Sequence, residues 1–143
     1  MKEFMIQLTY AVEWCMQYPK ESKQCDSNHK HDEIILHGLW KIIENNCKSF
    51  TISQEEIIKI LRTIPNSEEI APEYFDEVNN IAVHEWNKHG ICMNMTPEEY
   101  FQKAFYLVQE IKKNNYKGGE VITSKTGKPL YINFYYDSNF EKN

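Results

Sequence analysis

The chain has 143 residues, of which 41% are hydrophobic and 26% are charged. This size and composition are ordinary for a globular protein with one hydrophobic core, so we expect a single domain over residues 1–143. The formal net charge of −5 at pH 7 argues against electrostatic binding of nucleic acid over a broad surface, because such binding depends on the neutralisation of phosphates. It does not exclude a nuclease whose positive charge is confined to a cleft.

The first element predicted along the chain is a strand. Residues 4–10 alternate between apolar and polar side chains and include aromatic and β-branched types, a pattern typical of a half-buried strand. Gln7 and Thr9 interrupt the apolar run and no basic segment accompanies it, so we do not interpret it as a signal peptide. No stretch of the chain approaches the length that spans a bilayer.

A polar segment and a second strand follow. Residues 16–32 are polar and predict a loop. Residues 33–40 are apolar up to the first of two histidine motifs, and they predict a strand that ends there. Within that motif, Gly38 would allow a close approach of the backbone to another group.

Helix signals dominate the middle of the chain. Ser53 and Glu56 form a capping box before an apolar run, which predicts a helix that Pro65 stops. Residues 66–75 read as a connector, and a second helix should run from about Phe75 through the second histidine motif. Thr96 and Glu99 form another capping box, with a proline at the first helical position and a long apolar stripe after it.

Two short strands complete the chain, over residues 120–123 and 130–136, with glycine-containing turns around the first. Together, these elements predict an α+β fold in which a central, largely antiparallel sheet packs against several helices.

The four cysteines are Cys15, Cys25, Cys47 and Cys92. No CxxC pair occurs, so a zinc ribbon or a thioredoxin-type site is not expected. Four cysteines permit three disulfide pairings, and the simplest joins neighbours along the chain. Four reduced thiols remain the alternative. Disulfides would imply an oxidising compartment.

Two motifs carry most of the chemistry: His37-Gly38-Leu39-Trp40, and the segment that runs from His84 to Cys92 with the sequence HEWNKHGIC. Together they contain three of the five histidines, a carboxylate, an ammonium group and two tryptophans. Imidazole titrates near neutral pH, so one histidine of a pair can act as a base while the other acts as an acid.

A zinc protease is the first alternative, because His84 and Glu85 resemble half of a metal-binding helix. That site requires a second histidine four residues after the first, and Lys88 occupies the position. His84 and His89 are separated by roughly 140° around a helix axis, so we expect them not to share a face. We therefore expect no metal and no cofactor.

Cleavage of RNA suits the same residues well. A base takes the proton of the ribose 2′-hydroxyl, which attacks the adjacent phosphorus, and an acid protonates the departing 5′-oxygen. Each positioned proton transfer is typically worth about 10²–10⁴ in rate. Three histidines, Lys88 and Glu85 can supply the base, the acid and the charge stabilisation without a metal.

At these residues the chain resembles the ribonuclease T2 family. HGLW and HEWNKHGIC are similar to that family's two active-site segments, and residues 4–15 resemble its first strand leading to a cysteine. Cys47 matches the half-cystine after HGLW, and Tyr100-Phe101 matches the aromatic pair after the second motif. The resemblance covers residues 4 to about 111 and is faint beyond them.

The resemblance implies a role for each of these residues. It makes His89 the general base and His37 the general acid, with His84 on the phosphate. Glu85 and Lys88 would stabilise the pentacoordinate state, and Trp40 would flank or stack on a base of single-stranded RNA. It also implies disulfides between Cys15 and Cys25 and between Cys47 and Cys92.

The chain departs from the family pattern in three places. Lys41 follows HGLW where family members usually have proline, and Tyr10-Ala11 stands where the first strand commonly ends in Trp-Pro. The C-terminal region is short and lacks the cysteines expected there, with Tyr135 and Tyr136 near one such position.

We therefore expect an endoribonuclease that acts as a monomer on single-stranded RNA and is secreted, extracellular or located in another oxidising compartment. The chain would be either a mature form without its leader or a piece of a larger protein. One alternative is a delivered toxin domain with the same chemistry, which would have an inhibitor or immunity protein as its partner. Another is a catalytically inactive RNA-binding or storage homologue.

Overall fold

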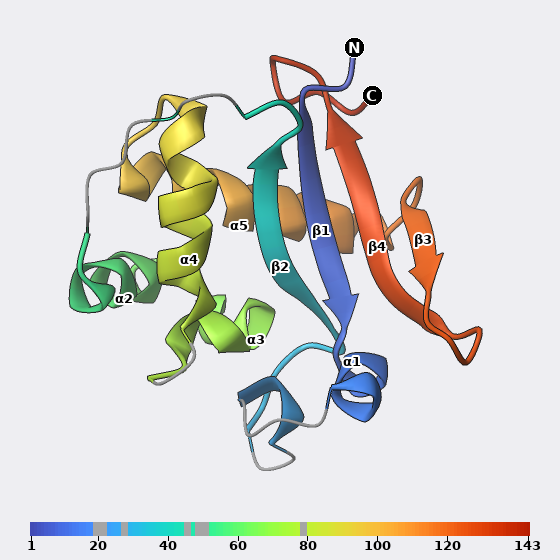
Figure 1. Ribbon diagram of the computed structural model, residues 1–143. Helices are drawn as coiled ribbons and strands as arrows, with labels where there is room; N and C mark the ends of the chain where they lie inside the picture. Colours follow the sequence, from blue (N-terminus) through green and yellow to red (C-terminus); the bar gives the residue numbers. More distant parts are fainter. Residues whose placement is uncertain (19–22, 27–28, 45–46, 48–51, 78–79) are drawn as a thin grey trace.

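A computed structural model describes residues 1–18, 23–26, 29–44, 47, 52–77 and 80–143. Its centre is a four-stranded antiparallel sheet in the order β2-β1-β4-β3 (Figure 1). The strands are β1 (Phe4–Tyr10), β2 (Ile34–Lys41), β3 (Glu120–Thr123) and β4 (Pro129–Tyr136). The α-helices are α1 (Ala11–Gln17), α2 (Gln54–Arg62), α3 (Ser67–Ile70), α4 (Ile81–Lys88) and α5 (Pro97–Lys113). The predicted α+β class is confirmed.

One face of the sheet forms the core. Phe4, Ile6 and Leu8 alternate along β1 and are buried. The register pairs Leu8 with Ile132 and Ile6 with Phe134, so side chains of both strands point to the same side. The period of two that predicted β1 therefore also marks its buried face.

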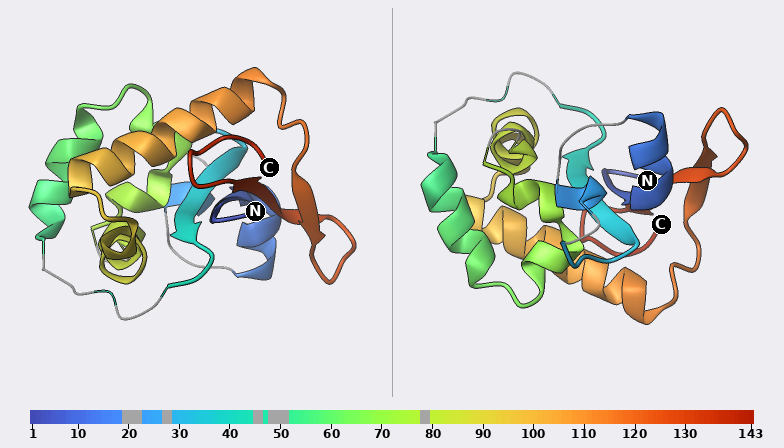
Figure 2. Two further views of the ribbon diagram at one scale, coloured as in Figure 1. Left: turned by 90° about the horizontal axis from the view of Figure 1, so that it is seen from above. Right: turned by 90° about the horizontal axis from the view of Figure 1, so that it is seen from below.

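Helix α5 covers that face, as Figures 1 and 2 show. It begins with the predicted capping box, in which the Thr96 hydroxyl accepts a hydrogen bond from the Glu99 amide and the Glu99 side chain accepts one from the Thr96 amide. Its buried residues are Tyr100, Phe101, Ala104, Phe105, Leu107, Val108 and Ile111. Their helical spacing places this apolar stripe against the sheet.

The helical segments differ from the prediction in three places. α1 occupies residues 11–17, where the sequence predicted the end of a strand and the start of a loop. α3 and a 3-10 turn, η2 (Pro72–Phe75), lie in the predicted connector. The helix expected from Phe75 begins only at Ile81, because the Asn80 side chain accepts hydrogen bonds from the Ala82 and Val83 amides and caps it there.

A β-bulge interrupts the pairing of β1 with β2 at the first histidine motif. Gln7 pairs with Gly38 and Leu8 pairs with Leu36, so His37 is the extra residue between them. A bulge changes the direction of the side chains that follow it. Leu36 and Leu39 consequently both reach the core, while His37 is only partly buried.

Both implied disulfides are present. Cys15–Cys25 joins α1 to the 3-10 turn η1 (Lys23–Cys25), and Cys47–Cys92 joins the segment after β2 to η3 (Gly90–Met93), which follows α4. Among the described residues, none of the helices has the length and apolar character required to cross a membrane.

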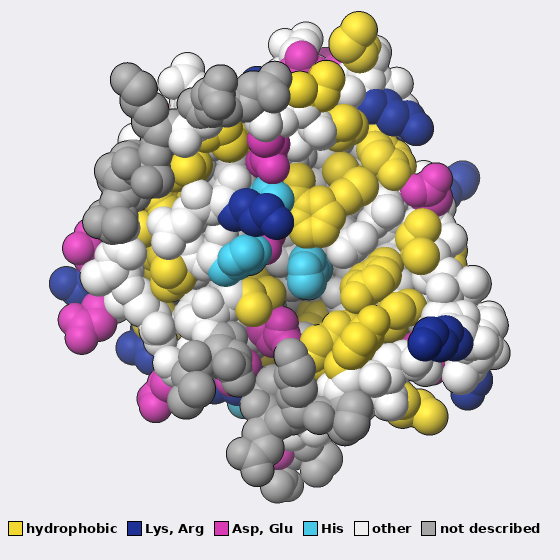
Figure 3. Space-filling model, viewed as in Figure 1, with side chains coloured by type: hydrophobic (Ala, Val, Ile, Leu, Met, Phe, Trp, Pro, Cys, Tyr) yellow, Lys and Arg dark blue, Asp and Glu magenta, His cyan; other side chains and the backbone are white. Residues whose placement is uncertain are grey.

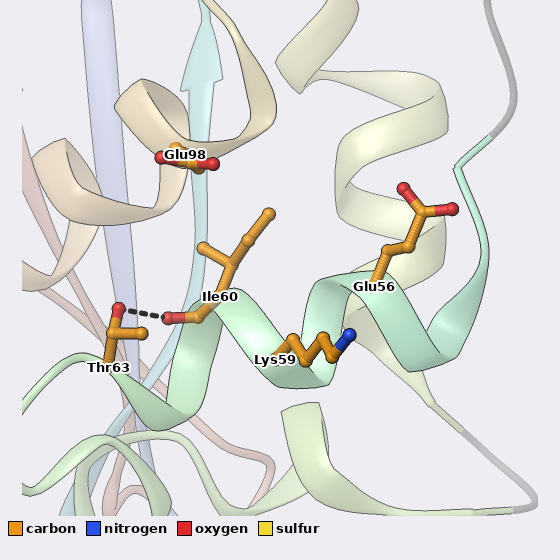
Figure 4. Close-up of a pocket in the computed structure, with 5 residues that line it drawn as sticks. All are labelled: Glu56, Lys59, Ile60, Thr63 and Glu98. Carbon is orange, nitrogen blue, oxygen red and sulfur yellow. Dashed lines mark hydrogen bonds between the residues drawn. The ribbon is translucent and has the colours of Figure 1, made fainter.

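A hollow of about 420 Å³ lies between α2 and the start of α5 (Figure 4). Its lining residues are Glu56, Lys59, Ile60, Thr63 and Glu98. None of them belongs to either histidine motif.

Candidate active site

The two histidine motifs meet where α4 stands beside β2. Figure 1 shows these elements as neighbours, and Figure 3 shows histidine side chains grouped on this face with a basic side chain over them. His37 and Trp40 come from β2, and His84, Glu85 and Lys88 come from α4. Segments far apart in sequence thus contribute to one surface.

A partly buried hydrogen bond joins the two motifs. The Trp40 indole nitrogen Nε1 donates to Glu85 Oε1 over 2.7 Å, and Glu85 is only 2% exposed. Gly38 makes this approach possible, because a Cβ atom there would lie 1.9 Å from Glu85 Oε1 and 2.6 Å from Trp40 Nε1. The close backbone approach expected at Gly38 is confirmed.

Two buried tyrosines fix the backbone of β2 around the motif. The Tyr74 hydroxyl donates to the carbonyl oxygen of His37 over 2.8 Å, and the Tyr100 hydroxyl donates to that of Leu39 over 2.7 Å. Burial raises the pKa of both phenols well above the ordinary value, so both remain neutral donors. The bulged strand is therefore anchored from the core side.

The indole ring of Trp40 lies close to two imidazoles. Its centroid is 5.6 Å from that of His37 and 5.2 Å from that of His89. The centroid of the His84 ring is 6.3 Å from that of His89. The three predicted histidines consequently surround one small region of the surface.

Our expectation that His84 and His89 would not share a face is wrong. His89 is the C-cap of α4, with a φ of −117°, so its side chain no longer follows the helical spacing. Among the described residues, His84, Glu85 and His89 offer ligand atoms within 4.8 Å of one another. This trio could hold a metal ion by distance, although Glu85 already accepts the hydrogen bond from Trp40.

Burial shifts the pKa values of two groups in opposite directions. It lowers the pKa of His37 to about 4, and the electrostatic influence of His84 and His89 contributes to this shift. Burial raises the pKa of Glu85 to about 8, against the hydrogen bond from Trp40 and the charge of Lys88. Near neutral pH, His37 is therefore uncharged and Glu85 carries its proton.

The structure also contains a residue that the sequence analysis missed. The His89 Nδ1 atom lies 2.8 Å from Glu44 Oε1 and 3.0 Å from Glu44 Oε2. The only available signal was indirect: Cys47 and Cys92 each follow one member of this pair by three residues. The implied disulfide between them could have placed Glu44 beside His89.

Lys88 and His84 complete the site on its solvent side, where both are exposed. The arrangement thus offers imidazoles in different environments, a neutral buried carboxyl group and an exposed ammonium group. This set can transfer two protons and stabilise an anion between them.

Comparison with known proteins identifies relatives in sequence. A family model described as "Ribonuclease T2 family" matches residues 1–132. Human "Ribonuclease T2" is 27% identical over 130 residues, which cover 85% of this chain and 47% of that protein. "Ribonuclease S-3" of Petunia hybrida is 28% identical over 114 residues, covering 73% of this chain and 47% of the relative. The chain spans about half the length of these two relatives.

Solved structures share the fold. Trichomaglin, described as a novel S-like ribonuclease, has a TM-score of 0.71 at 12% identity, with 99% of this chain and 90% of that chain covered. The self-incompatibility-associated SF11-RNase of Nicotiana alata has a TM-score of 0.63 at 14% identity and the same two coverages.

Proposed function

We propose, because the chain belongs to the ribonuclease T2 family, that it is an endoribonuclease that cleaves single-stranded RNA by transphosphorylation without a metal. The observation that carries this proposal is that one ring, Trp40, lies close to imidazoles of both motifs, 5.6 Å from His37 and 5.2 Å from His89. A phosphodiester in this region would be within reach of imidazoles from both motifs.

In the proposed reaction, His89 takes the proton of the ribose 2′-hydroxyl as the 2′-oxygen attacks phosphorus. The bond between phosphorus and the 5′-oxygen breaks, and His37 gives its proton to that oxygen. The products are a 2′,3′-cyclic phosphate and a free 5′-hydroxyl. Water then opens the cyclic phosphate to a 3′-phosphate, with the two histidines exchanging roles.

The remaining residues would stabilise the charge that develops on phosphorus. Lys88 and His84 are exposed and would contact phosphoryl oxygens, and protonated Glu85 could donate a hydrogen bond to one of them. A positioned donor of this kind is typically worth about 10²–10³ in rate. Trp40 would contact a base through the part of its ring that faces solvent.

The state of Glu85 favours the mechanism without a metal over a metal centre. A metal ligand must be deprotonated, but burial raises the pKa of Glu85 to about 8, and one of its oxygens accepts the Trp40 hydrogen bond. The trio of His84, Glu85 and His89 is therefore a poor metal site near neutral pH.

The test is cleavage of a defined RNA oligonucleotide in excess EDTA, with the termini of the products identified. We expect a cyclic phosphate intermediate, and a loss of at least about 100-fold in turnover for His37→Ala and for His89→Ala. Loss of wild-type activity in EDTA would favour a mechanism that depends on a bound metal ion. The absence of cleavage at every pH would favour an inactive RNA-binding homologue.

The two disulfides favour a protein that works in an oxidising compartment. A free secreted enzyme and a delivered toxin domain both satisfy this condition and use the same chemistry. Co-expression with candidate inhibitor or immunity proteins would distinguish these two uses.

A further inference from the structure

We infer that Glu44 is a positioning residue for His89: its carboxylate accepts the Nδ1 proton and so directs Nε2 toward the substrate as the basic nitrogen. This inference rests on the proposed function and adds a residue to it. The geometric basis is the pair of contacts from one imidazole nitrogen to both carboxylate oxygens, at 2.8 and 3.0 Å.

The chemistry follows from the two nitrogens of imidazole. In the neutral ring, one nitrogen carries the proton and the other holds the lone pair. A carboxylate at Nδ1 selects the tautomer that is protonated there, so Nε2 is left as the proton acceptor. The same carboxylate stabilises the imidazolium that forms when the base takes a proton.

The partial burial of the pair strengthens the electrostatic interaction between Glu44 and His89. The side chains of His89 and Glu44 are 12% and 21% exposed, so solvent screens their interaction only in part. Burial lowers the pKa of His89, and the charges of Lys88 and His84 lower it further. The hydrogen bond and charge of Glu44 act in the other direction and keep the base strong.

The charged and titratable groups described around this pair come from several elements, and Glu3 and Lys41 line the same hollow as Glu44. Glu44 lies in the segment after β2, while His84, Glu85 and Lys88 lie on α4 and His37 lies on β2. Glu85 is protonated near neutral pH because burial raises its pKa to about 8. Among the described residues, Glu44 is the carboxylate that contacts His89, and its charge favours the protonated form of that ring.

A disulfide lies close in sequence to both members of the pair. Cys47 follows Glu44 by three residues, and Cys92 follows His89 by three. Their disulfide has a Cα–Cα distance of 5.1 Å, so it holds together two residues that each lie three positions from one member of the pair. In addition, the amide of Ile42 donates to the carbonyl oxygen of Glu3 and anchors the chain just before Glu44.

The test begins with the wild-type protein. Nitrogen-15 NMR of the histidine rings should show His89 protonated at Nδ1 when it is neutral, and a neutral His89 protonated at Nε2 would overturn the inference without any variant. In Glu44→Ala, we expect a mixture of the two tautomers. An unchanged tautomer in that variant would also overturn it.

Kinetics provide the second readout. Glu44→Gln and Glu44→Ala should each lower kcat by about 10- to 100-fold with little change in KM. The limb of the pH profile that reports the base should move to lower pH in both, because a favourable negative charge is removed. Glu44→Asp should restore part of the rate.

Glu3 supplies a matched control. It lines the same hollow of about 320 Å³ as Glu44, so Glu3→Gln removes an equal charge nearby and should change neither the limb nor the tautomer. A Glu44→Gln variant that altered only the preference among RNA bases would overturn the inference and make Glu44 a base-reading residue. An inactive wild-type protein with His89 protonated at Nδ1 would refute the proposed function and still support the contact with Glu44.

Discussion

The carboxyl group of Glu85 lies directly against the backbone of Gly38, where a Cβ atom would come within 1.9 Å of Oε1. The oxygen that occupies this space accepts a hydrogen bond from the indole N–H of Trp40. The two motifs can therefore contact each other here only because residue 38 is a glycine and has no side chain.

Gly38→Ala should abolish this contact. The added methyl must displace either the Glu85 carboxyl group or the Trp40 ring, so we expect activity to fall by at least about tenfold and the protein to lose about 1–3 kcal/mol of stability. Urea denaturation and RNA cleavage measure the two effects. Gly127→Ala is the control: its Cβ meets nothing within 4 Å, but its φ of +83° disfavours alanine, so stability should fall while activity remains.

Glu85 should act as a neutral hydrogen-bond donor. Its pKa of about 8 keeps it protonated at the acidic and neutral pH values at which a histidine pair works. Glu85→Gln preserves the shape, the acceptor for Trp40 and a donor, so activity should stay within about tenfold of wild type. Glu85→Ala should lose about 10²–10³. A glutamine variant as inactive as the alanine variant would show that the negative charge is needed.

The pH profile of kcat/KM should be bell-shaped with its maximum below pH 6.5. Burial lowers the pKa of His37 to about 4 and also lowers the pKa of His89. The acid must be protonated and the base free, so activity is lost on both sides of an acidic optimum. A bound phosphodiester offsets the repulsion on His37 and should move the kcat profile to higher pH. A maximum of kcat/KM above pH 7 would contradict the assignment.

Glu85 should also make folding stability depend on pH. Its folded pKa of about 8 lies above the ordinary value of 4.5, so between these pH values the native state binds a proton that the unfolded state lacks. Stability should therefore fall as pH rises from 4.5 to 8, by at most about 1.4 kcal/mol per pH unit. Below pH 6.5, His37 opposes this trend, because its lowered pKa costs stability as pH falls from 6.5 to 4.

The wild-type protein and Glu85→Gln should be compared by urea denaturation at several pH values. The difference in their unfolding free energies isolates Glu85, since His37 is common to both proteins. A difference that does not change between pH 4.5 and 8 would mean that Glu85 titrates normally.

Loss of the Cys47–Cys92 disulfide should reduce activity more than loss of Cys15–Cys25. Replacing both cysteines of each pair by serine opens loops of 45 and 10 residues, which should cost about 4 and about 3 kcal/mol of stability. Of the two, the Cys47–Cys92 bond is the one that lies three residues from both Glu44 and His89. Equal losses of activity in the two folded variants would argue against that role.

The sequence by itself determined the elements whose signals are local. The period of two in β1, the caps at Ser53 and Thr96 and the apolar stripe of α5 all lie where they were predicted. These patterns reflect which side chains of a segment are buried and which face solvent, so they can be recognised from neighbouring residues alone. Resemblance to a family supplied the residue set of the site and the disulfide pairing.

Only the tertiary structure decided how these residues meet. The bulge at His37 and the departure of His89 from helical spacing depend on contacts between distant segments. The same is true of Glu44, which no local pattern connects to an imidazole 45 positions later. Burial, which sets the pKa values of His37 and Glu85, is likewise a property of the assembled core, because desolvation arises from every segment packed around a group.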